Sequence, residues 1–235
     1  MVETLDILNL DQLLVNPRAN VPITAESRGR RVMYQQEQQR LVALDSSNDN
    51  YSQFLRACNI CLKIDPLQTT NLDRVYELTE RTNQLNYSAR RFSKQQLIDI
   101  MTGQDGRQAL VLSASDKFGS YGIIGFAIVS QKTFMVDDFF MSCRVQRKKV
   151  DHAFFNWLLD IGRQQKQDKL SIIYRKTSRN GASLTVLQDE MLFTSQEQED
   201  GSLVFCMPCA AHVVDADLVT VNATAQFHVD GENTP

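Results

Sequence analysis

Long apolar runs are absent from this chain of 235 residues. None approaches the roughly 20 consecutive apolar residues that a membrane-spanning helix needs, so no membrane partner is expected. The first residues, MVETLDILNLDQLL, carry acidic side chains and no basic n-region, and they therefore do not resemble a secretory signal peptide. These absences together predict a cytoplasmic protein.

A broad excess of positive charge is also lacking. The chain has 25 Lys and Arg against 28 Asp and Glu, which gives a formal net charge of -3. Nucleic-acid binding usually needs a wide basic face, so no nucleic-acid partner is expected. Hydrophobic residues nevertheless make up 43% of the chain and include 12 Phe, which is ample for a packed core and excludes global disorder.

The cysteines number five, and disulfides are not expected in a reducing compartment. Cys58–Cys61 and Cys206–Cys209 form two CxxC pairs, which formally resemble a split zinc site. Neither pair lies in a Gly-rich knuckle, since Cys61 belongs to the strand-like ICLKI and Cys206 follows the apolar run LVF. We therefore expect no metal, and cysteines that serve as small core residues.

The chain divides at about residue 50. Thr24 is positioned to cap a helix over 25–44, whose thin apolar stripe is typical of a connector or docking arm. Ser and Asn residues at 46–50 then suggest a linker. The predicted units are an N-terminal extension with a connector helix (1–50), a main domain (51–212) and an irregular tail (213–235).

Helical and strand patterns alternate within the main domain. Helices are predicted at 51–58, 71–84, 94–101, 149–165 and 181–191, and strands at 60–64, 109–114, 123–129, 134–141, 170–174, 192–195 and 203–207. Three consecutive hairpin-linked strands followed by a strand–helix–strand unit predict a mixed sheet with helices on both faces. The fold class is therefore α/β (α+β), with about six or seven strands.

Val136–Val150 reads as a buried strand that runs into the start of an amphipathic helix. Arg144, Arg147, Lys148 and Lys149 crowd this helix start. Free backbone N–H groups and the helix dipole already favour an anion there, and four cationic side chains strengthen the attraction. A solvated charged turn is the alternative interpretation.

The order of elements is that of the GNAT acyltransferase fold, and several motifs narrow the resemblance. They are Arg81–Asn86 (RTNQLN), Asp116–Gly119 (DKFG) with Gly122 and Gly125, Asp137 with Phe139–Val145 (FFMSCRV), Tyr174 with Thr177 and Asn180, and the helix around Met33–Glu37. In this order they resemble the C-terminal GNAT-like domain of FkbH-like proteins, over roughly residues 25–195.

That resemblance implies a ligand, because the fourth strand of the GNAT fold leads into the loop and helix that hold the pyrophosphate of acyl-CoA. It implies that acyl-CoA or a phosphopantetheine thioester contacts Phe140, Met141, Ser142, Arg144, Val145, Gln146, Arg147, Lys148, Lys149 and Asn180. It places substrate contacts at Arg81, Asn83, Gln84 and Asn86. It also implies that backbone N–H groups of Phe140–Cys143 polarise the thioester.

Two residues are candidates for catalysis. Asp137 lies on the central strand near the expected cleft and is a candidate general base, although a polar strand-edge role is the alternative. Cys143 lies beside the anion site, which favours a thiolate, whereas its strand-end position suits packing. Asn180 and the Arg81–Asn86 segment have structural alternatives as well, as a helix cap and as partners of the loop backbone.

The sequence departs from the family pattern at three points. Arg147 and Lys149 stand where the pyrophosphate loop usually carries glycines, and the segment 183–189 (SLTVLQD) lacks the tyrosine that often acts as general acid. The Asp-x-Asp-x-Thr motif of the haloacid-dehalogenase-like domain found upstream in the family is absent too, so glyceryl loading is not carried over.

Two functions follow as alternatives. One is a GNAT-type acyltransferase acting on a carrier-protein-bound or small acceptor in polyketide-type secondary metabolism. The other is a non-catalytic GNAT-like module that docks an acyl carrier protein, or a haloacid-dehalogenase-like partner, on its basic loop.

Overall fold

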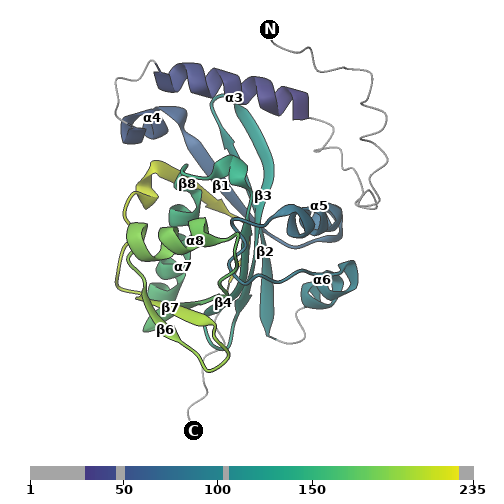
Figure 1. Ribbon diagram of the computed structural model, residues 1–235, viewed down its shortest axis with the longest axis vertical. Helices are drawn as coiled ribbons and strands as arrows, with labels where there is room; N and C mark the ends of the chain where they lie inside the picture. Colours follow the sequence, from purple (N-terminus) through teal and green to yellow (C-terminus); the bar gives the residue numbers. More distant parts are fainter. Residues whose placement is uncertain (1–29, 46–50, 103–105, 228–235) are drawn as a thin grey trace.

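The computed structural model of the protein describes residues 30–45, 51–102 and 106–227 (Figure 1). Within these ranges eight strands form one sheet, in the order β6-β7-β5-β4-β3-β2-β1-β8. The pairs β1–β8 and β4–β5 are parallel, and the remaining neighbours are antiparallel. The predicted mixed α/β fold is confirmed, with a sheet slightly larger than expected.

The predicted elements of the main domain form with boundaries shifted by a few residues. The strands are β1 Ile60–Pro66, β2 Arg107–Asp116, β3 Gly119–Ser130, β4 Met135–Met141, β5 Lys169–Tyr174, β6 Thr194–Glu197, β7 Leu203–Pro208 and β8 Val219–Ala223. The helices are α3 Arg30–Asp45, α4 Tyr51–Cys58, α5 Thr69–Arg81, α6 Lys94–Met101, α7 Val150–Gln164 and α8 Gly181–Thr185. Short turns complete them: η2 Cys143–Val145, the π-helical η3 Val186–Glu190 and η4 Ala216–Leu218.

Helices cover both faces of the sheet, with α5 and α6 on one side and α7 and α8 on the other (Figure 1). Strand β4 serves both cores because successive side chains point to opposite faces. Phe139 stacks on Phe154 of α7, with ring centroids 5.1 Å apart. Phe140 packs instead against Phe92 and Phe126 on the α5–α6 side. The apolar run of β4 therefore reflects burial on both faces, as predicted.

The expectation of an irregular tail from Val213 is wrong for residues 219–223. These residues form β8, which lies parallel to β1 and covers an edge of the sheet that would otherwise expose unpaired backbone groups. The alternation of Val219 and Val221 with polar residues is the strand signal that the expectation overlooked.

The N-terminal arm is helical from Arg30 to Asp45, and α3 lies across one end of the sheet (Figure 1). The predicted cap Thr24, residues 25–29, the linker 46–50 and the end of the tail beyond 227 lie outside the described residues.

The two cysteine pairs lie far apart, as predicted. Cys61 is in β1 and Cys206 in β7, and four strands separate these two in the sheet. Cys58 and Cys209 are buried, and burial raises the pKa of both thiols. Among the described residues, no group of three or more His, Cys, Asp or Glu side chains is arranged to hold a metal ion. None of the helices in these ranges is both long and apolar enough to cross a membrane.

Candidate functional site

Strands β4 and β5 diverge, as predicted, soon after they meet. Their backbones pair only at Met135 with Ser171 and at Val136 with Ile172. The opening between them is filled by another part of the chain, the segment Leu85–Tyr87. This segment follows α5 and crosses the gap like a short extra strand, forming an isolated bridge between Asn86 and Phe140.

Hydrogen bonds fix this wedge, Leu85–Tyr87, to both strands. Met141 N–H donates to the Leu85 carbonyl (2.9 Å), and Tyr87 N–H donates to the Phe139 carbonyl (3.0 Å). On the other side, Arg175 N–H donates to the Tyr87 carbonyl (2.8 Å). The next N–H group after β4, that of Ser142, donates to the Ile124 carbonyl of β3 (2.7 Å). The expectation that the backbone N–H groups of Phe140–Cys143 polarise a thioester is therefore wrong for Met141 and Ser142, because both N–H groups already have partners.

Asn180 holds the wedge from the β5 side. Its side-chain amide donates to the carbonyls of Asn86 (2.9 Å) and Arg175 (2.8 Å), while its Oδ1 accepts from Thr177 N–H (2.8 Å) and the Tyr174 hydroxyl (3.0 Å). Asn180 occupies the position before α8, but its side chain does not cap that helix. Since the residue is fully buried, it orders the wedge and does not reach a cavity.

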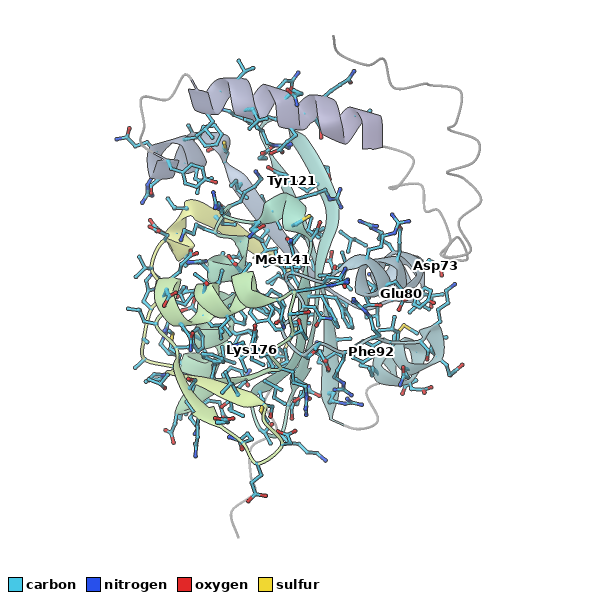
Figure 2. The ribbon with its side chains drawn as sticks, in the orientation of Figure 1. Asp73, Glu80, Phe92, Tyr121, Met141 and Lys176 are labelled. Carbon is cyan, nitrogen blue, oxygen red and sulfur yellow. The ribbon has the colours of Figure 1, made fainter. Side chains whose placement is uncertain are left out.

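A large cavity lies beside the wedge, at the end of β4. This cationic pocket has a volume of about 1120 Å³ and is bounded by α3, α5, the turn after β4 and the loop before α8. Figure 2 labels two of its lining residues, Tyr121 just beneath α3 and Met141 further from it. The site therefore combines the arm, the wedge and the basic turn.

Positive charge dominates the lining. Six side chains are cationic and only Glu37 is a carboxylate; the cations are Arg40, Arg74, Arg81, Arg144, Lys148 and Arg179. Helix α5 supplies two of them, and the buried carboxylate of Glu77 bonds to both Arg74 and Arg81 at 2.9 Å. The three residues share one helix face because they are three and four positions apart. Glu77 thus aims two guanidinium groups at one place.

Arg40 anchors the arm to the edge of the pocket. Its guanidinium donates to both oxygens of Asp116 (2.7 and 2.9 Å) and lies 4.1 Å from the centre of the Tyr121 ring. Burial alone would raise the pKa of Asp116, but hydrogen bonds from Arg40 and Tyr121 outweigh it and hold that pKa below its ordinary value. At Gly119 an added Cβ would lie 2.1 Å from the Gln36 amide nitrogen, so the glycine makes room for α3.

Glu37 extends from the arm to the basic turn after β4. Its carboxylate lies 3.2 Å from Arg40 and 3.6 Å from Lys148. With Glu77 and Asp116 behind the lining, the region keeps an excess of about three positive charges over its carboxylates. Glu37 therefore reduces the positive potential of the pocket without cancelling it.

The basic turn presents alternate residues to the pocket. Arg144, Gln146 and Lys148 line it, whereas Arg147 and Lys149 do not. Arg147 and Lys149 have φ values of +66° and +59°, the left-handed conformation that favours glycine. They are also the positions where the family pattern has glycines. The backbone thus keeps a glycine-type shape with larger residues whose side chains point elsewhere.

Lys149 joins a separate charged cluster. Its ammonium group lies 2.7 Å from Glu190, 3.7 Å from Asp215 and 3.1 Å from the Nε2 of His152. The other ring nitrogen of His152 lies 2.9 Å from the Asp151 carboxylate. Four cations were expected at the anion site, and the structure brings Arg144 and Lys148 to it.

The remaining predicted residues divide in the same way. Those that line the cationic pocket are Arg81, Asn83, Gln84, Met141, Ser142 and Cys143. Asn86 lines a smaller neighbouring pocket. Phe140 and Val145 have their side chains in the two cores. Asp137 is half-buried on β4 and lines neither pocket, so the structure does not bring the two catalytic candidates together.

Sequence reasoning missed Glu37, Arg40, Arg74 and Arg179, which reach the pocket from elements far apart in the chain.

Sequence reasoning also missed Asp138, the neighbour of the candidate base. Asp138 is fully buried, and its Oδ1 is without a hydrogen-bond partner among the described residues. Burial raises the pKa of Asp138 to about 6, although Ser88 and the charge of Arg90 oppose the shift. A carboxylate inside an apolar strand was the available signal.

No protein-family model matches this sequence, and no curated protein matches it. Among solved structures, the chain is similar to a domain from Methanocaldococcus jannaschii, with 11% identity and a TM-score of 0.51 over 63% of this chain and 99% of that one. It also resembles the ribosomal-protein-S18-alanine N-acetyltransferase from Escherichia coli (16% identity, TM-score 0.44, 73% and 97% covered). A third similar structure is a GNAT superfamily phosphinothricin acetyltransferase from Sinorhizobium meliloti in complex with AcCoA, with 16% identity and a TM-score of 0.45 over 64% of this chain and 88% of that one. Identities this low describe the fold alone.

Proposed function

We propose that the cationic pocket binds a phosphate-bearing pantetheine thioester, either acyl-CoA or the phosphopantetheine of an acyl carrier protein. In this proposal the protein is a GNAT-type acyltransferase of the FkbH-like kind, which acts on a carrier-bound or small acceptor in polyketide-type metabolism. The single observation behind it is the cavity of about 1120 Å³ with six cationic side chains at the end of β4.

The charge of the pocket suits such a ligand. Guanidinium groups make strong charge-assisted hydrogen bonds to phosphate oxygens, and Arg74, Arg81 and Arg144 present three of them. Glu77 already orders two of these side chains, so less conformational entropy is lost when they bind. The volume of about 1120 Å³ lies just above the usual range for a small-molecule site, which suits an elongated cofactor.

The lining also limits the chemistry. Because the Met141 and Ser142 N–H groups are engaged, negative charge that develops on a thioester oxygen would be stabilised by Arg144 and Lys148. Cys143 is exposed between Ser142 and Arg144 in the same lining. An acceptor would attack the thioester carbonyl directly, and the thiol of the pantetheine arm would leave.

One observation favours a second candidate function. The wedge Leu85–Tyr87 uses the β4 backbone groups that face β5, so a pantetheine arm cannot pair with that edge while the wedge stays in place. A non-catalytic module that docks the acidic surface of an acyl carrier protein, or of a haloacid-dehalogenase-like partner, needs only the positive charge around the pocket.

Calorimetric titration with acetyl-CoA and with a phosphopantetheinylated acyl carrier protein tests the proposal. The double variant Arg144→Gln/Lys148→Gln should weaken binding about 10- to 100-fold, as expected when charge-assisted contacts to phosphate are lost. Arg147→Gln is the matched control, since it removes a charge from the same turn outside the pocket lining, and it should bind like the wild type.

Release of free thiol from the acetylated ligands separates the two candidates. An acyltransferase should release thiol faster than the uncatalysed reaction when an acceptor is present, whereas a docking module should bind the carrier protein and leave the thioester intact. If neither ligand binds the wild-type protein at low salt, both candidate functions are wrong.

A further inference from the structure

A smaller cavity opens beside the cationic pocket. This side pocket has a volume of about 160 Å³ and shares Asn83, Ser178 and Arg179 with its neighbour. Its other lining residues are Asn86, Ala89, Arg91 and Thr177. The volume suits a molecule with on the order of six non-hydrogen atoms. Because the two cavities share part of their lining, their ligands would lie next to each other.

The side pocket is positively charged and contains no carboxylate. Its lining carries two guanidinium groups, those of Arg91 and Arg179, and otherwise only amide, hydroxyl and methyl groups. Among the described residues, neither arginine forms an ion pair with a carboxylate. An ammonium group would find no counter-ion there, whereas a carboxylate would find two.

Arg91 is held in a fixed place by the loop it belongs to. Its guanidinium donates to the carbonyl oxygens of Thr79 and Thr82 and to the Asn83 Oδ1 (2.6 Å). These acceptors are neutral, so they orient the side chain and leave its full charge at the pocket. Asn86 is similarly oriented, because its amide donates to the Arg90 carbonyl (2.9 Å).

Arg179 lies at the junction of the two pockets, because it lines both of them. Its side chain is exposed and makes no hydrogen bond or ion pair within the described part of the chain. The position is set by the backbone, since Arg179 N–H donates to the Thr177 hydroxyl (3.2 Å) beside the buried Asn180. An ordered backbone with an unengaged guanidinium suits capture of an anion.

We propose that the side pocket is the subsite for the second substrate, and that this substrate is a small carboxylic acid in its anionic form. The role as a substrate subsite rests on the proposed acyltransferase function. The binding of a carboxylate in the side pocket does not depend on that function. The charge of the lining disfavours amine and polyamine acceptors, which would enter as cations.

Three molecules of nearly equal size test the charge preference: lactate, its neutral amide lactamide, and the cationic 1-amino-2-propanol. In ligand-observed NMR titrations of the wild-type protein, lactate should bind in a saturable manner. Lactamide should bind at least about tenfold more weakly, as expected for a lost charge-assisted contact, and the ammonium compound should not saturate. Equal binding of all three, or a preference for the cation, would overturn the proposal.

Two variants locate the site. Arg179→Gln should reduce lactate affinity at least about tenfold, because the cation that would bind the carboxylate is lost. Lys176, labelled in Figure 2, belongs to the same exposed loop and lies outside both linings. Lys176→Gln removes its charge and should leave the affinity unchanged. An equal loss in both variants would show a general charge effect and refute the subsite.

The outcome separates this subsite from the cationic pocket. Lactate binding that depends on Arg179, in a protein that binds neither acetyl-CoA nor the phosphopantetheinylated carrier protein, would support the side pocket and refute the proposed function. Acetyl-CoA binding without a preference for lactate over lactamide and 1-amino-2-propanol would support the proposed function and refute the side pocket as a carboxylate site. If both ligands bind, adding acetyl-CoA should change the lactate affinity, because the pockets share Asn83, Ser178 and Arg179.

Discussion

Two adjacent carboxylates on β4 have different surroundings. Asp137 is half-buried, whereas Asp138 is fully buried with one oxygen bonded to Arg90 (3.0 Å) and the other without a partner among the described residues. Burial is the main reason that the pKa of Asp138 rises to about 6. An unfolded aspartate titrates near pH 3.9, so the native state holds this proton more tightly than the unfolded state.

The sign of the pH dependence follows. Below about pH 4 both states are protonated, and Asp138 carries no electrostatic penalty. As the pH rises from about 4 to 6 the native state loses stability relative to the unfolded state, by about 2–3 kcal/mol at full effect. Asp138→Asn should remove this loss, so that its stability advantage over the wild type grows across that interval. Urea unfolding of both proteins at several pH values measures this difference in unfolding free energy. A difference that stays constant between pH 4 and 6 would contradict the account.

Arg147 offers a second test at the residue scale. Its φ of +66° is unfavourable for any residue with a Cβ, by roughly 1 kcal/mol. The comparison of Arg147→Gly with Arg147→Ala isolates this strain, because both variants lose the same charge and keep the carbonyl that accepts from the Tyr51 hydroxyl. The glycine variant should be more stable by about 0.5–1 kcal/mol in urea unfolding. A more stable alanine variant would mean that the turn is not left-handed in solution.

The sequence predicted an anion site at the basic turn but could not choose among its cations. That choice depends on the left-handed backbone at Arg147 and Lys149, which turns alternate side chains away from the pocket. Glycine is the usual signal of such a conformation, and here it is absent. Partners such as Arg179 are distant in sequence, so only tertiary structure brings them to the site.

At the scale of elements, α3 is held by charge more than by apolar contact. Its thin apolar stripe predicted a connector or docking arm without indicating what holds it, and Val32 and Val42 are exposed. The anchor is the buried ion pair of Arg40 with Asp116, whose side chains are 5% and 1% exposed. Periodicity arguments count apolar residues and therefore overlook the contribution of a buried arginine to the docking of a helix.

This anchor predicts a non-additive pair of substitutions. Arg40→Met leaves Asp116 buried with the Tyr121 hydroxyl and backbone N–H groups as its donors, and should cost about 3 kcal/mol of unfolding free energy. Asp116→Asn should cost a similar amount, because Arg40 then stays buried without its main partner. The double variant should lose clearly less than the sum of the two. Strict additivity would show that the pair does not hold the arm.

Most other elements followed from hydrophobic periodicity, including the β2–β3–β4 hairpins and α7. The strand β8 did not follow, because a short alternating pattern such as that of Val219 and Val221 is a weak strand signal. It forms a strand here because it pairs with the edge of β1. The wedge Leu85–Tyr87 was also unpredictable, since a three-residue segment carries no periodic signal. Its position depends on the divergence of β4 from β5.

At the scale of the whole molecule, a chain with a net charge of -3 concentrates positive charge at one place. Carboxylates elsewhere in the chain outnumber these cations and make the net charge negative. The composition therefore excluded a broad basic face but gave no sign of a local cluster of positive charge. Such a site attracts anions from solution, and the attraction weakens when salt screens it. Binding at the cationic pocket should therefore become weaker as ionic strength rises.

The most direct test of the central claim compares coenzyme A with pantetheine, which has the same arm without the phosphates and the nucleotide. Calorimetry at low salt should show that coenzyme A binds and that pantetheine binds at least about 100-fold more weakly, since phosphate contacts supply the affinity. The coenzyme A affinity should also fall as salt is added. Equal affinities, or a coenzyme A affinity that does not change with salt, would contradict a phosphate-binding site in the cationic pocket.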